Sequence, residues 1–395
     1  MYLNLNSDDC KDNTPILIVL SHLRWDFVFQ RPQHILTRAT QNYDVFYIEE
    51  PIFEGQSFSF REFERAPGVR IIQPILPPGT SAADSIFHQG DVAESIAARA
   101  NGRQVVLWYY TPTALTFGHR VDADLIIFDK MDELASFAFA PPELRAQEVS
   151  LMDIADVVFT GGASLHAAAA GRHSNIHCFP SSIDTAHFGK ARAKRDPDPG
   201  DQSHLRHPRL GYFGVIDERI DLRLIAEVAA LRPDWQLVMV GPTAKIDPAG
   251  LPQAANIHWL GSKDYQQLPA YLAHWDIGWM PFALNDATRF ISPTKTPEFL
   301  AAGLPLLSTP IHDVVEPYGR LGLVEIISNA QALVEAGDRM LAAERVPARF
   351  AARLAAIDSQ LATGSWDATW SAMHALIQIP AQVAAPVKTR EAALV

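Results

Sequence analysis

The chain has 395 residues, of which 48% are hydrophobic and 20% are charged, and it carries a formal net charge of −12. This length exceeds one ordinary hydrophobic core, so we expect two domains. The acidic balance argues against nucleic acid as the main partner, because binding to a phosphate backbone needs a basic face. Cys10 and Cys178 are too few for a disulfide framework, which fits a reducing cytoplasm.

The apolar runs of the chain have the length of strands and fall short of the roughly 20 residues that a membrane-spanning helix needs. The first residues lack the basic start and apolar centre of a secretory signal. We therefore expect a cytoplasmic protein without a transmembrane segment, and we leave open a peripheral contact with the inner face of the membrane.

Short β-branched runs alternate with Ala- and Leu-rich helical patterns in the first half of the chain. The expected strands cover residues 16–20, 44–48, 69–72, 105–109, 125–129, 157–160 and 176–179. Alternation of this kind predicts a parallel sheet with helices on both faces. We assign residues 1–189 to this first domain.

Residues 190–208 are polar and rich in proline and charge, so we expect a loosely packed interdomain linker there. The alternation restarts after it, and residues 209–364 form the second expected domain. Residues 365–379 have the apolar spacing of a helix that crosses back to the first domain, and 380–395 are expected to be a flexible tail. The predicted fold is α/β, with two Rossmann-like domains facing a cleft.

In parallel sheets, ligands bind beyond the carboxyl ends of the strands, so we examined the residues that follow each expected strand. In the first domain, a polar turn after residues 16–20 contains Arg24, Trp25, Asp26, Gln30, Arg31 and His34. Arg31, close to a positive helix end, suits a phosphate or an anionic acceptor.

A second acidic turn ends the strand at 125–129. Asp129 is the better candidate for facing the cleft, since Asp132 and Glu133 are also explained by the favourable first turn of a helix.

In the second domain, Gly214 directly follows a strand, and Arg219 lies near the start of the next helix, where a diphosphate could rest. The stretch SPTKTPEFLAAGLPLLSTP covers residues 292–310. It predicts a short helix over 297–302, stopped by Gly303 and followed by a buried strand. Lys295 and Glu298 stand three residues apart at this helix.

Several common motifs are missing. The glycine pair in TGGASLHAAAAG lacks the G-x-G-x-x-G spacing of a dinucleotide site. The glycine-rich phosphate loop, the histidine–glutamate metal patterns and the G-x-S-x-G serine turn do not occur. We therefore expect no bound cofactor and no metal.

The two-unit layout, with GYFG and DER at 211–219, LVMVGP, WLG and above all SPTKTPEFLAAGLPLLST, resembles glycosyltransferases with the GT-B fold. The similarity is greatest to the retaining group called glycosyltransferase family 4. In the first half, RWDFVFQRPQHIL, FDKMDELASF and HCFPSSIDTAHF resemble a bacterial branch that makes cell-surface polysaccharides, the teichuronic-acid-type glycosyltransferases. The resemblance covers most of the chain.

The resemblance implies roles for the residues of the second domain. A Glu at the place of Glu298 accepts hydrogen bonds from the ribose hydroxyls of a nucleotide-sugar, as two carboxylate oxygens allow. The helix start, with Thr294 and Thr296, would supply N–H groups to the diphosphate, and Lys295 and Arg219 would supply charge. Two glycines match places where the backbone closes around the nucleotide: Gly214 and Gly241.

Two departures leave the donor sugar open. The family often has a second Glu eight residues before Glu298, where this chain has Phe290. Its role would fall to Asn285, Asp286, or backbone groups near Ile291 and Ser292. Where many relatives carry His at the strand end, this chain has Asp129. That residue would contact the donor sugar or stabilise positive charge developing at its anomeric carbon.

The leading hypothesis is a retaining, metal-independent glycosyltransferase. It would move a sugar from a nucleoside-diphosphate sugar, with UDP as the expected nucleotide, to a polysaccharide, a glycolipid or a small acceptor. Catalysis is assigned to Asp129, Arg31, Arg219 and Lys295. The alternatives are a hydrolysing sugar-nucleotide epimerase, which shares the fold, and a non-catalytic subunit that binds a nucleotide-sugar.

Overall fold

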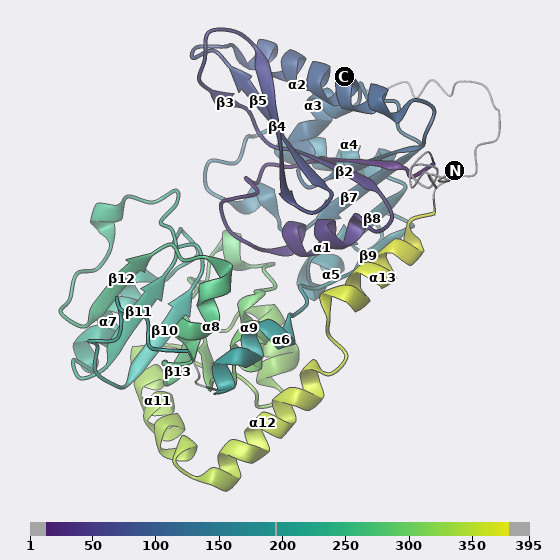
Figure 1. The fold of residues 1–395 in the computed structure, drawn as a ribbon. Coiled ribbons are helices and arrows are strands. Elements are labelled where there is room, and N and C mark those ends of the chain that lie inside the picture. The colour runs from purple at the N-terminus through teal and green to yellow at the C-terminus, as the bar shows by residue number, and fades with distance from the viewer. Residues whose placement is uncertain (1–12, 194–195, 379–395) are drawn as a thin grey trace, which may run out of the picture.

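The computed structural model describes residues 13–193 and 196–378 of the chain, so Cys10 and the whole expected tail, 380–395, lie outside the described residues. Two sheets, each packed against helices, form two domains that lie side by side (Figure 1). The α/β architecture with two Rossmann-like domains is therefore confirmed.

The first sheet has nine strands in the order β3-β5-β2-β1-β6-β7-β8-β9, with β4 paired to β5. Their bounds are β1 Ile16–Leu20, β2 Asp44–Ile48, β3 Ile52–Phe53, β4 Ser59–Ala66, β5 Val69–Leu76, β6 Val105–Tyr109, β7 Leu125–Lys130, β8 Val157–Thr160 and β9 Ile176–Cys178. The strands pair in parallel except for β4, which is antiparallel to β5.

Both faces of this first sheet are buried, which explains its apolar strands. In β1, Ile16 and Ile18 belong to one hydrophobic cluster, and Leu17 and Val19 belong to another on the opposite face. Successive side chains of a strand point to opposite faces, so a strand covered on both sides must be apolar throughout.

Strand β4 was not expected from the sequence. Its residues SFREFERA are mostly exposed, and no face of it carries a continuous apolar pattern. It forms because it pairs antiparallel along β5, and hydrophobic periodicity does not reveal this pairing.

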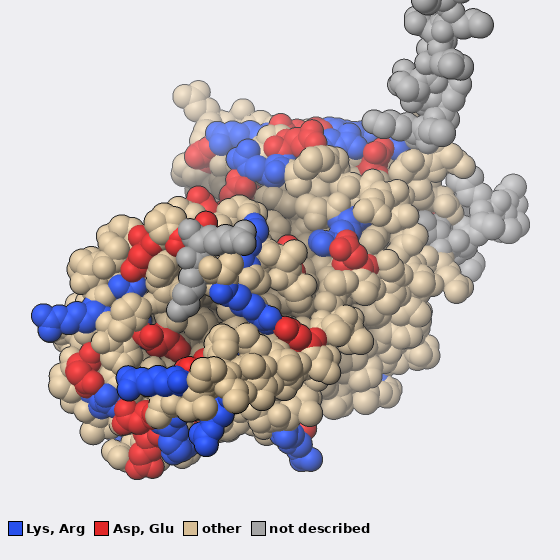
Figure 2. All heavy atoms as spheres, turned by 60° about the horizontal axis from the view of Figure 1, so that its bottom comes forward, with Lys and Arg blue, Asp and Glu red and all other residues tan. Residues whose placement is uncertain are grey.

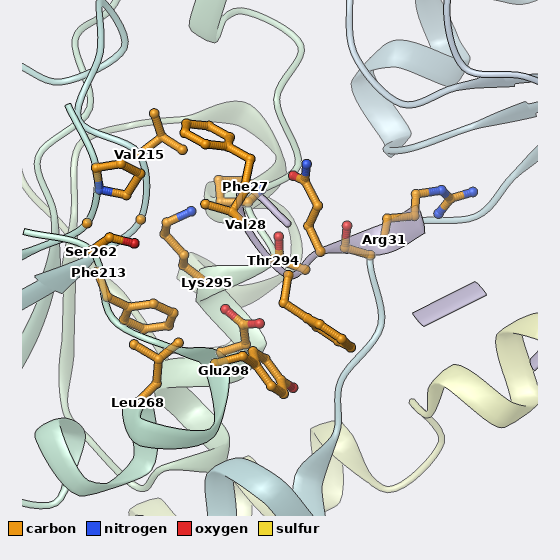
Figure 3. Close-up of a pocket in the computed structure, with 18 of the residues that line it drawn as sticks. Phe27, Val28, Arg31, Phe213, Val215, Ser262, Leu268, Thr294, Lys295 and Glu298 are labelled. Atoms are coloured by element: carbon orange, nitrogen blue, oxygen red, sulfur yellow. The ribbon is translucent and has the colours of Figure 1, made fainter. Parts of the chain in front are cut away.

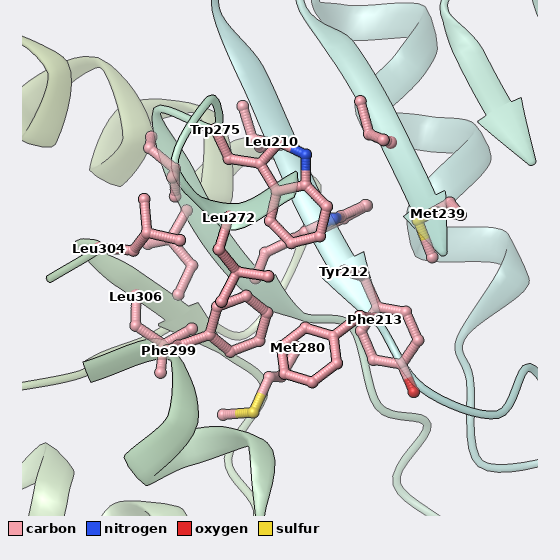
Figure 4. Close-up of a cluster of buried hydrophobic side chains, with 14 of the residues drawn as sticks. Leu210, Tyr212, Phe213, Met239, Leu272, Trp275, Met280, Phe299, Leu304 and Leu306 are labelled. Carbon is pink, nitrogen blue, oxygen red and sulfur yellow. The ribbon is translucent and has the colours of Figure 1, made fainter. Parts of the chain in front are cut away.

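The second sheet has six parallel strands in the order β12-β11-β10-β13-β14-β15. Their bounds are β10 Arg209–Phe213, β11 Gln236–Val240, β12 Ile257–Gly261, β13 Ile277–Met280, β14 Leu306–Ser308 and β15 Glu325–Ile326. Aromatic side chains fill the space between this sheet and its helices (Figure 4).

The α-helices of the first domain are α1 Arg31–Ala39, α2 Ala82–Ala97, α3 Leu115–Gly118, α4 Leu144–Ile154 and α5 Ala163–Ala169. Those that follow are α6 Thr185–Phe188, α7 Leu222–Leu231, α8 Leu268–Leu272, α9 Lys295–Ala301, α10 His312–Val314, α11 Ala330–Glu344, α12 Pro347–Leu361 and α13 Trp366–Leu376. Helix α13 packs on the first domain, where Trp366, Trp370 and Met373 join the cluster that contains Leu17 (Figure 1).

The expectation that residues 190–208 pack loosely is wrong for the part that the structure describes. Gln202 is fully buried, and its Oε1 accepts a hydrogen bond of 3.0 Å from Trp275 Nε1. Leu205 belongs to the core of the second domain, and Arg192 Nε donates to the Ala301 carbonyl at 2.7 Å. Polar side chains with buried partners fix this segment, although it has few apolar residues.

The chain therefore passes between the two cores at two other places. Phe179 packs against the first domain, whereas Ile183 belongs to the core of the second. Leu361 belongs to the second core, and Trp366 belongs to the first. The two crossings lie at residues 179–183 and 361–366.

Within the described residues, no helix is both long and apolar enough to span a bilayer. On the face in Figure 2, basic and acidic side chains are interspersed rather than gathered by sign.

Candidate active site

A cavity of about 460 Å³ lies between the two domains, at the carboxyl ends of strands from both sheets (Figure 3). The first domain contributes residues that follow β1, β7, β8 and β9, namely Trp25–Arg31, Met131, Asp132, Gly161 and Ser181, with three further residues, Thr37, Arg65 and Ala66. The second domain contributes Tyr212–Val215, Arg219, Val240–Pro242, Ser262–Tyr265, Leu268, Phe282, Ile291–Lys295 and Glu298. This is the place where parallel α/β sheets bind ligands.

Helix α9 presents the two charged residues of the motif SPTKTPEFLAAGLPLLSTP to this cavity. Its Phe299 is fully buried and packs on Phe213 with ring centroids 4.9 Å apart (Figure 4). That contact fixes the helix against the sheet, while Lys295 and Glu298 line the cavity (Figure 3). The helix begins at Lys295, two residues earlier than Pro297, where the sequence placed its start.

Glu298 is a buried carboxylate with an unusual environment. Its residue is 8% exposed, and within the described part of the chain its side chain has no hydrogen-bond or ion-pair partner. Burial raises the pKa of this carboxyl to about 8, although the charge of Lys295 acts in the opposite direction. A perturbed, unpartnered carboxylate in a cavity is typical of a ligand site.

Lys295 lies in the same part of the cavity. Burial lowers the pKa of its amino group, and the nearby Glu298 carboxylate opposes that change. Its Nζ lies 6.0 Å from the ring centroid of Tyr212, which belongs to β10. The cation is thus held over an aromatic face beside the cavity.

Positions 214 and 241 require glycine because the chain packs closely around Lys295 there. Both have positive φ angles, 136° and 146°. A Cβ at Gly214 would overlap Lys295 Cε, and a Cβ at Gly241 would overlap the carbonyl oxygen of Gly214. The two glycines therefore allow the β10 and β11 ends and the Lys295 side chain to occupy one small space.

Arg219 contributes the second cation of the cavity. Asp217 accepts from Arg219 Nε at 3.0 Å and from its Nη2 at 2.7 Å, which fixes the plane of the guanidinium. Burial opposes the charge of Arg219, but the hydrogen-bonded Asp217 carboxylate raises its pKa overall. Arg219 therefore stays charged beside Lys295.

Asp132 is the carboxylate that the first domain brings to the cavity. It lines the cavity two residues after β7 ends, and burial raises its pKa while Arg219 and Lys130 act to lower it. The sequence pattern favoured Asp129 for this place, and the position of Asp132 just after the strand is the signal that identifies it instead.

The structure does not place Asp129 in the cavity. Asp129 is fully buried and accepts two hydrogen bonds from Arg31, at 3.0 Å from Nε and 2.9 Å from Nη2. Arg31 Nη1 donates to the Phe179 carbonyl at 2.7 Å, and the Arg31 side chain points away from Lys295 and Glu298 (Figure 3). Asp129 therefore does not line the cavity, whereas Arg31 does but uses its guanidinium group to bind Asp129. The catalytic role expected of these two residues stays a prediction.

The remaining predicted residues divide into two groups. Ser292 and Thr294 line the cavity, as do Gly214 and Gly241. Thr296 does not, because its side chain is 1% exposed and its Oγ1 lies 3.7 Å from Met280 Sδ in the core.

The residues expected to replace the family's earlier Glu lie in different places. Ile291 and Ser292 reach the cavity, whereas Phe290 and Asp286 line a second cavity beside it. Asn285 instead caps the short helix at Asp286–Thr288, where its Oδ1 accepts from Thr288 N at 3.1 Å.

Three of the contacts that join the two domains lie around the cavity. Phe29 stacks on Tyr265 with ring centroids 4.5 Å apart. Ala138 N donates to Glu218 Oε1 at 3.0 Å. At the start of α5, Ser164 N donates to Asp313 Oδ1 at 3.1 Å.

The glycine pair of TGGASLHAAAAG lies at the third of these contacts. Gly161 lines the cavity, and a Cβ at Gly162 would press on Asp313 and Ser292. The pair therefore serves close domain contact rather than a dinucleotide.

Solved structures with the same arrangement include several enzymes of sugar transfer. A sucrose-phosphate synthase from Thermosynechococcus elongatus aligns with a TM-score of 0.69 and 16% identity, over 92% of this chain and 98% of that one. A structure described as trehalose-6-phosphate from E. coli bound with UDP-2-fluoro glucose aligns with a TM-score of 0.65 and 12% identity, over 92% and 99%. WaaG, a glycosyltransferase involved in lipopolysaccharide biosynthesis, aligns with a TM-score of 0.61 and 13% identity, over 92% and 99%.

Sequence comparison agrees with the fold. The family described as glycosyl transferases group 1 matches residues 207–343. A Bacillus subtilis (strain 168) protein, named for a glycosyltransferase of teichuronic acid biosynthesis, TuaH, is 28% identical over 233 residues. That match covers 55% of this chain and 58% of the relative, so it spans little more than half of each protein.

The fold of this chain is GT-B, the two-domain fold of one class of glycosyltransferases. Within it, residues 207–343 are a glycosyl transferases group 1 domain. This domain carries Gly214, Arg219, Lys295 and Glu298, the residues that line the second-domain side of the cavity.

Proposed function

We propose that this protein is a retaining, metal-independent glycosyltransferase that uses a nucleoside-diphosphate sugar, with UDP as the nucleotide. The observation that carries the proposal is Glu298, a buried carboxylate without a partner in the described chain, beside two cations in an interdomain cavity. Its oxygens would accept the two ribose hydroxyls. Lys295 and Arg219 would hold the diphosphate.

In the reaction, the bond between the anomeric carbon and the β-phosphate oxygen breaks, and the electron pair leaves with the nucleoside diphosphate. The two cations would stabilise this added negative charge, which is the part that a metal ion plays in other sites. The acceptor hydroxyl attacks the same face of the sugar, and the leaving phosphate oxygen takes its proton. No separate general base is needed for this step.

We assign to Asp132 the role that the sequence suggested for Asp129. Asp132 enters the cavity from the first domain, opposite the residues of α9. Its carboxylate would bind a hydroxyl of the donor sugar or stabilise positive charge at the anomeric carbon. Burial raises the pKa of Asp132, and the charges of Arg219 and Lys130 oppose that shift.

The acceptor would be a carbohydrate, either lipid-linked or part of a growing cell-surface polysaccharide. The relative named for teichuronic acid biosynthesis supports that direction. Such an acceptor would place the protein in the cytoplasm, with peripheral contact at the inner face of the membrane.

The test is nucleotide binding followed by turnover. We expect titration calorimetry to detect UDP, and we expect UDP release from a UDP-sugar to rise when a carbohydrate acceptor is added. Glu298→Ala should weaken UDP binding by about 5- to 150-fold, because a hydrogen-bonded pair of ribose hydroxyls is worth roughly 1–3 kcal/mol. Unchanged UDP affinity in that variant would refute the assignment of Glu298.

The same assay separates the alternatives. Release of UDP that does not depend on an acceptor would favour a hydrolysing epimerase, and UDP binding without any turnover would favour a non-catalytic subunit.

A further inference from the structure

A second cavity of about 450 Å³ lies next to the first and also between the domains. It is lined by Glu133, Ala135, Ser136, Arg145, Asp286, Arg289 and Phe290. The two cavities are adjacent, because consecutive residues line them. Asp132 and Ile291 line the first cavity, and their chain neighbours Glu133 and Phe290 line the second.

Two arginines enter this second cavity from opposite domains. Arg145 belongs to α4 of the first domain, and Arg289 follows the short helix Asp286–Thr288 of the second. Both are exposed, and within the described residues neither side chain has a hydrogen-bond or ion-pair partner. Almost every other arginine around the cleft is paired, as Arg219 is with Asp217 and Arg31 with Asp129.

The carboxylates of the cavity do not cancel these charges. Glu133 Oε2 accepts from Lys130 Nζ at 3.0 Å, so its charge is already compensated. Asp286 is the one other carboxylate of the lining. Two guanidinium groups therefore face a single uncompensated carboxylate, which leaves an excess of positive charge.

The remaining surface suits a sugar ring. Arg289 lies over the Phe290 ring with its Cζ 5.1 Å from the centroid, and the edge of that aromatic side chain forms part of the wall. Ser136 adds a hydroxyl that can donate to or accept from a sugar hydroxyl. Guanidinium groups bind carboxylates and phosphates through two parallel hydrogen bonds.

We infer that this second cavity is the acceptor subsite, and that the acceptor is a sugar bearing an anionic group, a carboxylate or a phosphate, which Arg145 and Arg289 bind together. This inference rests on the proposed transferase function, since it names the acceptor class of that reaction. An anion held between arginines of the two domains also favours the closed cleft.

The test compares charged and neutral sugars at saturating UDP. Ligand-observed NMR would measure binding of glucuronate, glucose 6-phosphate and glucose to the intact protein. We expect at least one of the two anionic sugars to bind more tightly than glucose, and the arm that binds identifies the anion as carboxylate or phosphate. Arg145→Gln and Arg289→Gln should each weaken that binding about tenfold or more, because a charge-assisted pair is lost.

The matched control is Arg223→Gln, which removes an 88% exposed arginine whose carboxylate partner is Glu227 on the same helix. It should leave anion binding unchanged. Equal binding of charged and neutral sugars, or no loss in either cavity variant, would overturn the inference.

A further variant excludes a purely structural role for the arginines. Asp286→Asn should bind the anionic sugar at least as tightly as the unaltered protein, because it removes the opposing charge. If Asp286→Asn and Arg145→Gln instead weaken binding equally, the arginine serves an ion pair across the cleft and the inference fails. UDP affinity, measured separately, should stay constant in all four variants. If the unaltered protein does not bind UDP, that result counts against the proposed function. The comparison of charged and neutral sugars still tests whether the second cavity binds an anionic sugar.

Discussion

Glu298 and Asp129 are both buried carboxylates, but only Asp129 is hydrogen-bonded to an arginine. Asp129 receives two hydrogen bonds from Arg31, whereas the side chain of Glu298 has no such partner in the described chain. A buried carboxyl group without a hydrogen-bond partner destabilises a fold whether or not it is ionised, so its retention beside a cavity indicates a ligand that binds it.

Glu298→Gln should change how stability depends on pH. The folded-state pKa of Glu298 is about 8, above its ordinary value of 4.5, so the folded protein retains a proton that the unfolded chain has lost between these pH values. The free energy of unfolding contributed by this group therefore falls as pH rises from about 4.5 to 8.

The variant lacks this titration, so its stability relative to the unaltered protein should rise by about 2–4 kcal/mol across that interval. Urea unfolding at pH 5, 6.5 and 8 without nucleotide measures the difference. Parallel pH profiles would contradict the raised pKa.

Asp129→Ala and Asp132→Ala should impair different properties of the protein: the first should lower its stability, and the second should lower its turnover. Asp129→Ala leaves the buried Arg31 without a carboxylate partner, which should lower the free energy of unfolding by about 3–5 kcal/mol. Asp132→Ala should leave stability nearly unchanged and lower turnover far more than UDP affinity, because Asp132 faces the reacting sugar. Chemical unfolding, UDP titration and steady-state kinetics of the two variants test the contrast. A stable Asp129→Ala protein with impaired turnover would return the catalytic role to Asp129.

Lys295 and Arg219 are expected to make a divalent metal unnecessary. Activity in EDTA should equal activity with added Mg²⁺ or Mn²⁺, whereas Lys295→Met should lower kcat by about 10²- to 10³-fold through the loss of charge stabilisation at the leaving group. Initial rates of UDP release measure both effects. Activity that disappears in EDTA and returns with a divalent ion would show that the cations do not suffice.

At the scale of elements, the ends of β10 and β11 and the start of α9 form one packed unit. Gly214 lies against the Lys295 side chain, and Gly241 lies against Gly214. The three segments can pack this closely only because residues 214 and 241 are glycines, which have no Cβ atom.

Gly214→Ala should displace Lys295 and weaken UDP binding by about tenfold or more. The added methyl group would overlap Lys295 Cε, and the φ of 136° strains any residue with a Cβ. Gly250→Ala is the matched control, since a Cβ there meets nothing within 4 Å and its φ is not positive. UDP titration of both variants is the measurement, and equal affinities would show that Lys295 accommodates the methyl group without loss.

At the scale of the whole molecule, two chain crossings and three contacts hold the domains around the cavity. The crossings at 179–183 and 361–366 are the places where backbone rotation can open the cleft, since the segment 190–208, where it is described, is fixed to the second domain. The contact of Asp313 with the start of α5 joins the two domains across the cleft.

Asp313→Ala should open the cleft in the absence of nucleotide. It removes the carboxylate that accepts from Ser164 N, so the radius of gyration measured by X-ray scattering should increase, and UDP should reverse part of that increase. Asp358→Ala is the control, because Asp358 is exposed and pairs with Arg192 within the second domain. An unchanged radius in Asp313→Ala would mean that the Phe29–Tyr265 stack and the Ala138–Glu218 hydrogen bond suffice for closure.

The sequence alone determined most strands of both sheets, with the exception of β3 and β4, and the motif around Glu298. Strands buried on both faces are apolar throughout, and the glycines and prolines that end helices and strands act locally. Both features can therefore be recognised from the sequence alone. The placement of Lys295 and Glu298 beside one cavity follows from their spacing on a short helix with a buried Phe299.

Only the tertiary structure decided which acid lines the cavity and which segments join the two domains. Asp129 is neutralised by an arginine 98 residues away in the chain, and no local pattern reveals such a partner. Residues 190–208 look mobile by composition, yet Gln202 and Arg192 find buried partners in the second domain. Charge pairing and polar packing between distant segments are properties of the folded chain, because they depend on which residues the fold brings together.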